Sequence, residues 1–269
     1  MEAVPHIGTY RRSLPVAIER LYENAIDWEH LPYVHRSTFS RIDCLEAGSW
    51  GFRARVWRRA REDGQAFVLE LRLDRDCRRW ITRTVEGPGR GSEVWTHAFA
   101  IDERRTDIVV DFFAPGQAHR TETLGRFYRE LYARLYDEDV AMMALRQQRL
   151  REASRDQSKE SSEHYLLGRL EDVRARLPLV IELAGQRFRV VEVGGELFAH
   201  TVVCPHLLGP LDNAEVMTDG SIECPWHGYR FDLRTGACRG RAELRLRPMV
   251  AIRIDPATSL VTAVSGKEP

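Results

Sequence analysis

Residues 204–236 read CPHLLGPLDNAEVMTDGSIECPWHGYRFDLRTG, and this stretch decides the fold of the C-terminal part of the chain. Cys204-Pro-His206 is followed, after seventeen intervening residues, by Cys224-Pro-Trp-His227. Thiolates and neutral imidazoles are metal ligands, and turn-forming residues such as Gly228 follow the second pair. The pattern predicts two short metal-binding loops on a small β domain.

This spacing resembles the signature of Rieske iron–sulfur proteins, in which two cysteines hold one iron and two histidines hold the other. The resemblance implies a [2Fe-2S] cluster on Cys204, His206, Cys224 and His227, and it makes electron transfer the first hypothesis. A zinc site with the same four ligands is the alternative. Zinc sites do not usually place one histidine beside a cysteine in each half of the motif.

Two positions of the loops separate types of Rieske protein, and a third departs from the family pattern. In the respiratory type each loop carries an extra cysteine and the two form a disulfide, whereas Gly209 and Trp226 stand at the corresponding positions here. The sequence is therefore similar to the oxygenase or ferredoxin type, with a potential toward the lower part of the roughly −150 to +300 mV range. Leu208 stands where the family often has glycine, so we expect an altered backbone in the first loop.

The composition limits the classes of function. The chain has 269 residues with 43% hydrophobic content, enough for two domains, and its 40 basic and 40 acidic residues cancel. This balance gives no electrostatic case for nucleic acid or an anionic membrane as partner. Cys44, Cys77 and Cys238 remain beside the two ligand cysteines, without the spacing of a disulfide framework. No stretch is long and apolar enough for a membrane span, and we expect a cytoplasmic protein.

The charged, serine-rich residues 151–164 predict a linker between a domain over 1–150 and a domain over 165–269. Before the linker, apolar periodicity predicts an extended segment, a helix, a series of strands and a long helix. The corresponding ranges are 6–14, 16–26, 52–57, 67–73, 80–85, 94–101, 107–113 and 121–150.

This order of elements resembles the helix-grip (START-like) fold, in which an antiparallel sheet wraps a long C-terminal helix and leaves a ligand cavity between them. The fold class is therefore α+β, with an all-β Rieske domain after the linker. The predicted strands offer two sets of side chains that line such a cavity or simply form the core. The sets are Trp95, His97 and Phe99, and Ile108, Val110 and Phe112.

A second motif lies in the first domain, where residues 24–35 read NAIDWEHLPYVH. The pattern NxxDxxHxxxxH is similar to the iron-binding motif of Rieske non-haem iron oxygenases. That resemblance implies that His30 and His35 are ligands of a mononuclear Fe(II) and that Asp27 links the iron site to the cluster. By itself, HxxxxH is more often two unrelated histidines.

The third ligand of such an iron is a carboxylate, because these oxygenases bind iron through two histidines and one carboxylate. Glu138-Asp139, with Gln147 eight residues further on, resembles the family segment that supplies it. We therefore assign Asp139, with Asp137 as the alternative.

Together the motifs predict a Rieske non-haem iron oxygenase with its two domains in reversed order. It is expected to use O2 and electrons from an NAD(P)H-dependent reductase, a ferredoxin or both to hydroxylate, dihydroxylate or dealkylate a small hydrophobic or aromatic substrate. The family resemblance implies transfer between subunits, which favours a homotrimer. Two alternatives stay open: a non-catalytic Rieske electron carrier fused to a ligand-binding START-like domain, and a ligand-binding redox sensor.

Overall fold

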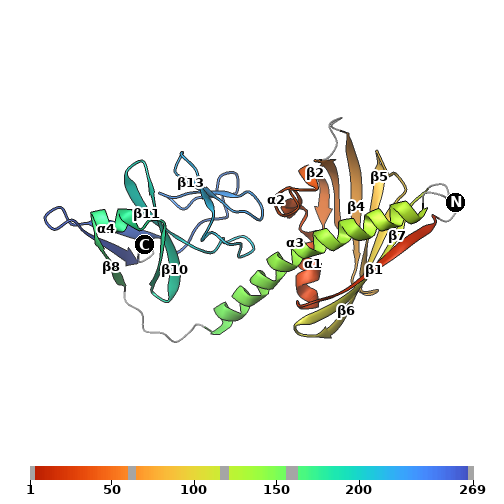
Figure 1. Ribbon diagram of the computed structural model, residues 1–269, viewed down its shortest axis with the longest axis horizontal. Helices are drawn as coiled ribbons and strands as arrows, with labels where there is room; N and C mark the ends of the chain where they lie inside the picture. The colour runs from red at the N-terminus through yellow and green to blue at the C-terminus, as the bar shows by residue number, and fades with distance from the viewer. Residues whose placement is uncertain (1–3, 60–64, 116–120, 156–162, 266–269) are drawn as a thin grey trace. The chain divides into compact units, whose positions relative to one another are not determined.

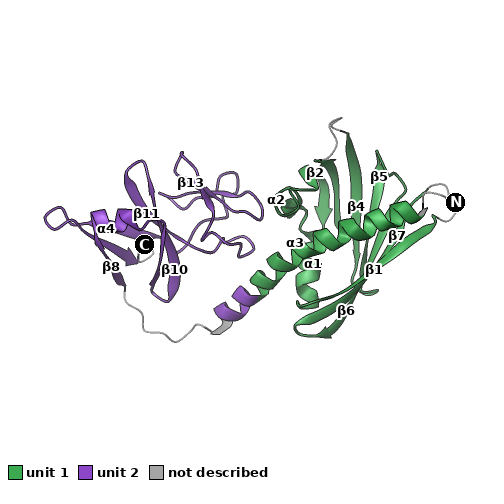
Figure 2. Ribbon diagram, viewed as in Figure 1, with its two compact units in different colours: residues 1–147 green, residues 148–269 purple. Residues whose placement is uncertain are grey.

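The chain divides after Gln147 into two units, residues 1–147 and 148–269 (Figure 2). The computed structural model describes residues 4–59, 65–115, 121–155 and 163–265. Half of the expected linker, residues 156–162, lies outside these residues. The long helix continues five residues beyond its predicted end, to Arg155, and the next strand begins at His164.

A seven-stranded antiparallel sheet forms most of the first unit, in the order β1-β7-β6-β5-β4-β3-β2. Every strand predicted from the sequence is present, and one additional strand, β2, was not predicted. The strands are β1 (His6–Leu14), β2 (Phe39–Gly48), β3 (Gly51–Arg58), β4 (Ala66–Asp74), β5 (Arg79–Glu86), β6 (Glu93–Asp102) and β7 (Arg105–Phe113).

A helical segment connects β1 to β2. It consists of α1 (Ile18–Ile26), the 3-10 turn η1 (Trp28–His30) and the single turn α2 (Leu31–Val34), which has Pro32 in its first turn. Proline fits there because the first helical N–H groups need no partner within the helix. The segment ends in two histidines, His30 and His35, separated by that turn.

The helix α3 (Thr121–Arg155) lies across one face of this sheet (Figure 1). Gly125 permits a close approach, because a Cβ atom there would lie 2.0 Å from the carbonyl oxygen of Ile7 on β1. Further along, the ring of Phe112 packs against Tyr128 and Tyr132 at centroid distances of 5.3 and 5.1 Å. The first unit is thus a helix-grip fold, as predicted.

Alternation along the strands decides which side chains face α3. Ile108, Val110 and Phe112 are fully buried on the inner face. Trp95, His97 and Phe99 are not: the buried residues of β6 are the alternate ones, and Phe99 is 42% exposed. The expectation that Trp95, His97 and Phe99 line an interior cavity or form the core is therefore wrong.

Two small antiparallel sheets form the second unit, in the orders β8-β16-β15-β11-β10-β9 and β12-β13-β14. Phe188, Val190, Val261 and Ala263 lie in the core of the larger sheet. None of the described helices has the length and apolar character needed to span a bilayer. The elements are β8 (His164–Arg169), α4 (Leu170–Ala175), β9 (Leu179–Leu183), β10 (Gln186–Val193), β11 (Glu196–Thr201), β12 (Glu215–Val216), β13 (Ser221–Glu223), β14 (Arg230–Asp232), β15 (Val250–Ile254) and β16 (Leu260–Ser265).

Candidate metal centres

Two loops of the second unit, one after β11 and one between β13 and β14, carry the Cys/His pairs and share one hydrogen-bond pattern. The N–H of Cys204 donates to the carbonyl of Gly209 (2.9 Å), and the N–H of Leu208 donates to the carbonyl of Cys204 (3.1 Å). In the second loop the N–H of Cys224 donates to Tyr229 (2.9 Å), and that of Gly228 donates to Cys224 (2.8 Å). Each loop is therefore a five-residue turn that begins at the cysteine.

Leu208 and Gly228 occupy the same place in these turns, and both have a left-handed backbone, with φ of 61° and 67°. A residue with a side chain rarely adopts that conformation, whereas glycine adopts it readily. The predicted alteration of the first loop is thus absent in the backbone. Leu208 instead adopts the conformation that glycine would have.

The two histidines of the loops direct their Nδ1 atoms toward each other, 3.4 Å apart, with ring centroids separated by 4.5 Å. Nitrogen ligands about 2.0–2.1 Å from one tetrahedral metal lie about 3.4 Å apart. Cys204 and Cys224 are fully buried beneath the loops. Their mutual hydrogen bond lowers the pKa of Cys224 and, with burial, raises that of Cys204, so the pair can lose its first proton readily.

Gly209 and Trp226, the positions of the respiratory-type disulfide, contact each other. A Cβ atom on Gly209 would lie 2.9 Å from Sγ of Cys224 and 3.1 Å from the ring of Trp226. The indole therefore fills the space that a second cysteine pair would use, and only glycine fits opposite it.

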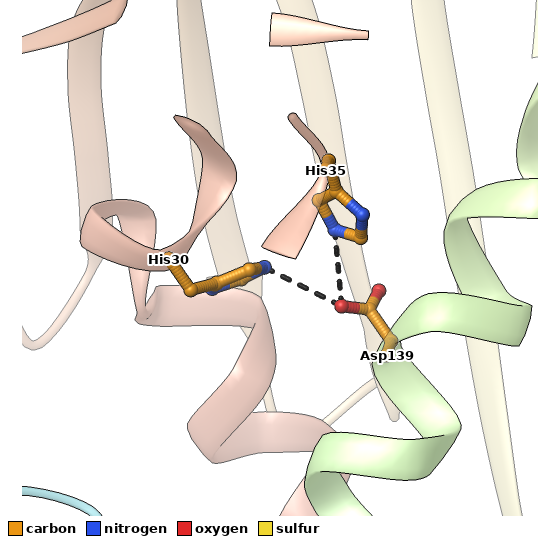
Figure 3. A group of neighbouring side chains, drawn as sticks. All are labelled: His30, His35 and Asp139. Atoms are coloured by element: carbon orange, nitrogen blue, oxygen red, sulfur yellow. Dashed lines mark ion pairs between the residues drawn. The ribbon is translucent and has the colours of Figure 1, made fainter. Parts of the chain in front are cut away.

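The first unit brings His30, His35 and Asp139 together, each more than 90% buried (Figure 3). Oδ1 of Asp139 lies 3.0 Å from Nε2 of His35 and 3.4 Å from Nε2 of His30. Ligand atoms about 2.1 Å from an ion with right-angled coordination lie about 3.0 Å apart. The spacing thus suits a two-histidine, one-carboxylate site.

Hydrogen bonding within this triad is incomplete although its atoms are close. Oδ1 of Asp139 has no hydrogen-bond partner among the described residues. A buried carboxylate oxygen without such a partner is costly, and a bound cation would remove that cost. The donor set therefore fits a metal ion.

Among the described residues, this triad is the one group of three or more possible ligands whose ligand atoms all lie within 4.8 Å of one another. A tetrahedral zinc with ligands about 2.0–2.3 Å away would draw all four Cys/His atoms within about 4 Å of one another. The quartet of the second unit does not meet that condition.

The profile of the Rieske [2Fe-2S] domain matches residues 163–248. A ferredoxin subunit of anthranilate 1,2-dioxygenase from Burkholderia cepacia is 36% identical over 77 residues, which are 28% of this chain and 69% of that protein. The chain belongs to the Rieske [2Fe-2S] family. This membership implies a [2Fe-2S] cluster and a role in electron transfer.

Two further proteins are similar to parts of this chain. The ferredoxin component of the p-cumate 2,3-dioxygenase system from Pseudomonas putida is 36% identical over 78 residues, and the match spans 29% of this chain and 62% of that protein. The solved structure of the Zhui aromatase/cyclase from Streptomyces sp. R1128 is 17% identical, with a TM-score of 0.40, over 57% of this chain and 95% of that one.

Outside the Rieske unit, a further carboxylate faces each histidine of the triad. Nδ1 of His35 donates to Oε2 of Glu138 at 2.7 Å, whereas Nδ1 of His30 lies 3.5 Å from Oδ2 of Asp27 without forming a hydrogen bond. The hydrogen bond to Glu138 fixes the ring and tautomer of His35, so that its Nε2 would be free to bind a metal ion. Asp27 was predicted from the sequence, whereas the role of Glu138 was not, because its only signal is its place beside Asp139.

The charges of the triad favour each other. Burial alone would lower the pKa of His30, but Asp139 and Asp27 outweigh it and raise this pKa to about 10. Burial alone would raise the pKa of Asp139, but His30 and His35 hold it far below its usual value.

Two other residues of α3 lie away from the triad. The side chain of Asp137 is 68% exposed and pairs with Arg12 at 2.6 Å, so it lies outside the group that Asp139 joins. Gln147 is buried, and its Oε1 accepts a hydrogen bond from the N–H of Ala17 at 2.7 Å. Gln147 therefore holds the start of α1 and is not part of the candidate site.

Proposed function

We propose that the chain is a Rieske-type mononuclear non-haem iron oxygenase. It uses O2 and electrons from an NAD(P)H-dependent reductase, a ferredoxin or both to hydroxylate, dihydroxylate or dealkylate a small hydrophobic or aromatic substrate. One observation carries the proposal beyond electron transfer. Asp139 has a buried oxygen without a hydrogen-bond partner, 3.0 and 3.4 Å from two histidine nitrogens.

In this proposal Cys204, His206, Cys224 and His227 hold the [2Fe-2S] cluster. His30, His35 and Asp139 hold an Fe(II), which supplies open coordination positions for dioxygen and substrate when bound. The chain's own residues orient the ligands: Glu138 holds His35 through Nδ1, and Asp27 faces Nδ1 of His30. Asp139 contributes the negative charge that favours a cation.

Asp27 has a second role in the proposal, as the link through which electrons from the cluster reach His30. In Rieske oxygenases that link generally joins neighbouring subunits, so we include a homotrimer and a cytoplasmic location. Replacing Asp27 by Asn keeps the side chain's shape and removes its charge. Both metals should remain while single-turnover product formation from pre-reduced protein slows, and an unchanged rate would exclude Asp27 from the link.

Iron content tests the oxygenase directly. We expect three irons per chain, two in the cluster and one in the triad. His30→Ala and Asp139→Ala should each contain two and keep the visible absorption of the cluster. Asp137→Ala is the matched control: it lies on the same helix but pairs with Arg12 at the surface, and it should contain three. Three irons in Asp139→Ala would refute the ligand assignment.

A second candidate function is a Rieske electron carrier fused to a ligand-binding START-like domain. The two relatives that are ferredoxin components of dioxygenases support it. This carrier would contain two irons per chain in wild-type protein. It would also consume no oxygen with NADH, a broad-specificity reductase and hydrophobic ligands, whereas the oxygenase would.

A further inference from the structure

Three tyrosines form a row that begins beside the candidate iron site. Tyr136 precedes Asp139 by three residues on α3, and residues three apart are neighbours on one face of a helix. The Tyr132 ring lies one turn earlier, with its centroid 6.3 Å from that of Tyr136. From β1, Tyr10 stacks on Tyr136 with centroids 6.1 Å apart and ring planes 16° from parallel.

The row leads from the interior to the surface. Tyr136 is buried, whereas Tyr10 is partly exposed. Nη1 of Arg12 lies 3.5 Å from the Tyr10 hydroxyl, to which it donates, and also pairs with the exposed Asp137. The Tyr10 hydroxyl therefore lies at the partly exposed end of the row, where a proton can pass to water.

The Tyr136 hydroxyl forms a hydrogen bond with Thr96, but the ring contacts of these tyrosines do not require hydroxyl groups. Burying a hydroxyl costs free energy that a phenylalanine ring avoids, and Phe112, in contact with Tyr132, shows that phenylalanine is used in the same core. What a phenol adds is chemistry: tyrosine loses an electron and a proton far more readily than phenylalanine does.

We propose that Tyr136 and Tyr10 carry oxidising equivalents from the iron site to the surface when an oxidant reacts there without substrate. This inference rests on the proposed iron site. With hydrogen peroxide as oxidant, one peroxide, one ferrous ion, one phenol and one proton give two waters, one ferric ion and one tyrosyl radical. Tyr136 supplies the electron and regains one from Tyr10, which releases its proton to water.

This transfer of oxidising equivalents through Tyr136 and Tyr10, the tyrosine relay, would protect the side chains nearest the iron. Without it, the oxidant would attack His30 and His35, whose rings lie within 5.1 Å of each other in the site. Loss of Tyr136 should therefore shift damage onto the histidines, which a purely structural role of the tyrosine would not cause.

The test uses the full-length, iron-loaded protein treated with hydrogen peroxide without substrate, then freeze-quenched for electron paramagnetic resonance. Wild-type protein should show a tyrosyl radical, and Tyr10→Phe should lose the surface radical. Tyr10→Trp should restore a radical with a tryptophan spectrum. Tyr136→Phe should lose the radical and gain oxidised His30 and His35, measured by peptide mass spectrometry. Tyr165→Phe, at an exposed tyrosine of the second unit, is the control and should match wild type.

Metal analysis of each sample distinguishes a failure of the proposed iron site from a failure of the tyrosine relay. Wild-type protein without the third iron overturns both the proposed function and the relay. If the third iron is bound but the radical persists unchanged in Tyr10→Phe and Tyr136→Phe, the relay is wrong and the iron site stands. A radical lost in Tyr165→Phe would also overturn the relay.

Discussion

The two candidate metal centres differ in how far apart their ligands lie in the sequence. The Cys/His quartet falls within residues 204–227, on two turns with the same backbone hydrogen bonds. The triad joins His30 and His35 to Asp139, which reaches them only because α3 packs across the sheet. One centre is therefore built by local turns and the other by the fold of a whole unit, so each should fail independently of the other.

Loss of a cluster ligand should have the largest effect and leave the other centre intact. Cys224→Ser removes a thiolate from the second turn, so the cluster irons and the visible absorption should both be lost. The triad should keep its single iron, measured by metal analysis. Cys238→Ser, another buried cysteine of the same unit, is the matched control and should retain the absorption. Loss of the triad iron in Cys224→Ser would show that the two centres depend on each other.

The two units should respond differently to acid, because each contains a buried histidine and the pKa values of the two histidines are shifted in opposite directions. In contrast to His30, which Asp139 and Asp27 favour in its charged form, His200 lies near Arg189, and burial lowers its pKa to about 4. Below the ordinary value of about 6.5, the unfolded chain therefore takes up a proton that the folded unit does not. The free energy of unfolding of the second unit should fall by about 3 kcal/mol from pH 7 to pH 4.

Denaturant titrations at several pH values, followed by the visible absorption of the cluster, measure this loss. Nδ1 of His200 donates to the carbonyl of Thr201 at 2.9 Å, and a glutamine amide can replace that donor. In His200→Gln, the decline in the free energy of unfolding from pH 7 to pH 4 should therefore be smaller by about 3 kcal/mol. An equally steep decline in His200→Gln would assign the acid sensitivity to other groups.

Glu138, which accepts a hydrogen bond from His35, should affect the metal affinity of the triad without being essential for metal binding. Glu138→Gln retains the shape of the side chain but weakens the hydrogen bond to Nδ1 of His35. Losing such a partner typically lowers metal affinity, here by about tenfold. Competition with a chelator measures the affinity. Asp137→Asn changes the preceding, exposed carboxylate and should leave the affinity unaltered; equal effects of the two changes would point to general electrostatics.

The smallest effect is expected where the two turns differ. Leu208→Gly removes a left-handed strain of about 1–2 kcal/mol and adds a chain-entropy cost of about 0.5–1 kcal/mol. The second unit should therefore gain about 0.5–1 kcal/mol in its free energy of unfolding. Leu208→Ala keeps the strained φ and should gain nothing. If Leu208→Gly is less stable than Leu208→Ala, the left-handed strain at position 208 is smaller than the chain-entropy cost of glycine.

The sequence predicted most strands because their inward residues alternate cleanly, as Phe52, Ala54 and Val56 do on β3. It missed β2, an edge strand with two register shifts and no fully buried residue. Shifts of this kind interrupt the period-two pattern on which strand prediction depends.

Alternation also identifies two faces of a strand without showing which one is buried. On β6 the larger side chains lie outside, where Nε1 of Trp95 donates to Glu93 and the guanidinium of Arg79 covers the indole. Polar partners from neighbouring positions thus allow aromatic residues on the outer face. Only the packing of α3 decided which face became the core.

Resemblance to a family supplied the triad, but the geometry around it depended on the rotation of α3. Successive residues of a helix point about 100° apart, so Asp137 and Asp139 point about 200° apart. An acidic triplet gives no sign of which member turns inward. Glu138 lies between them in the sequence, and its carboxylate accepts a hydrogen bond from Nδ1 of His35. The spacing of these residues in the sequence does not predict this contact.

The contact between Gly209 and Trp226 has a practical consequence for handling the protein. Where respiratory-type relatives join their loops by a disulfide, this chain uses an indole packed on a glycine. Thiol reductants have no bond to cleave at that junction, so purification under strongly reducing buffers should not loosen it. For the same reason, position 209 should not tolerate any residue larger than glycine, because even one methyl group would press against both Trp226 and the sulfur of Cys224.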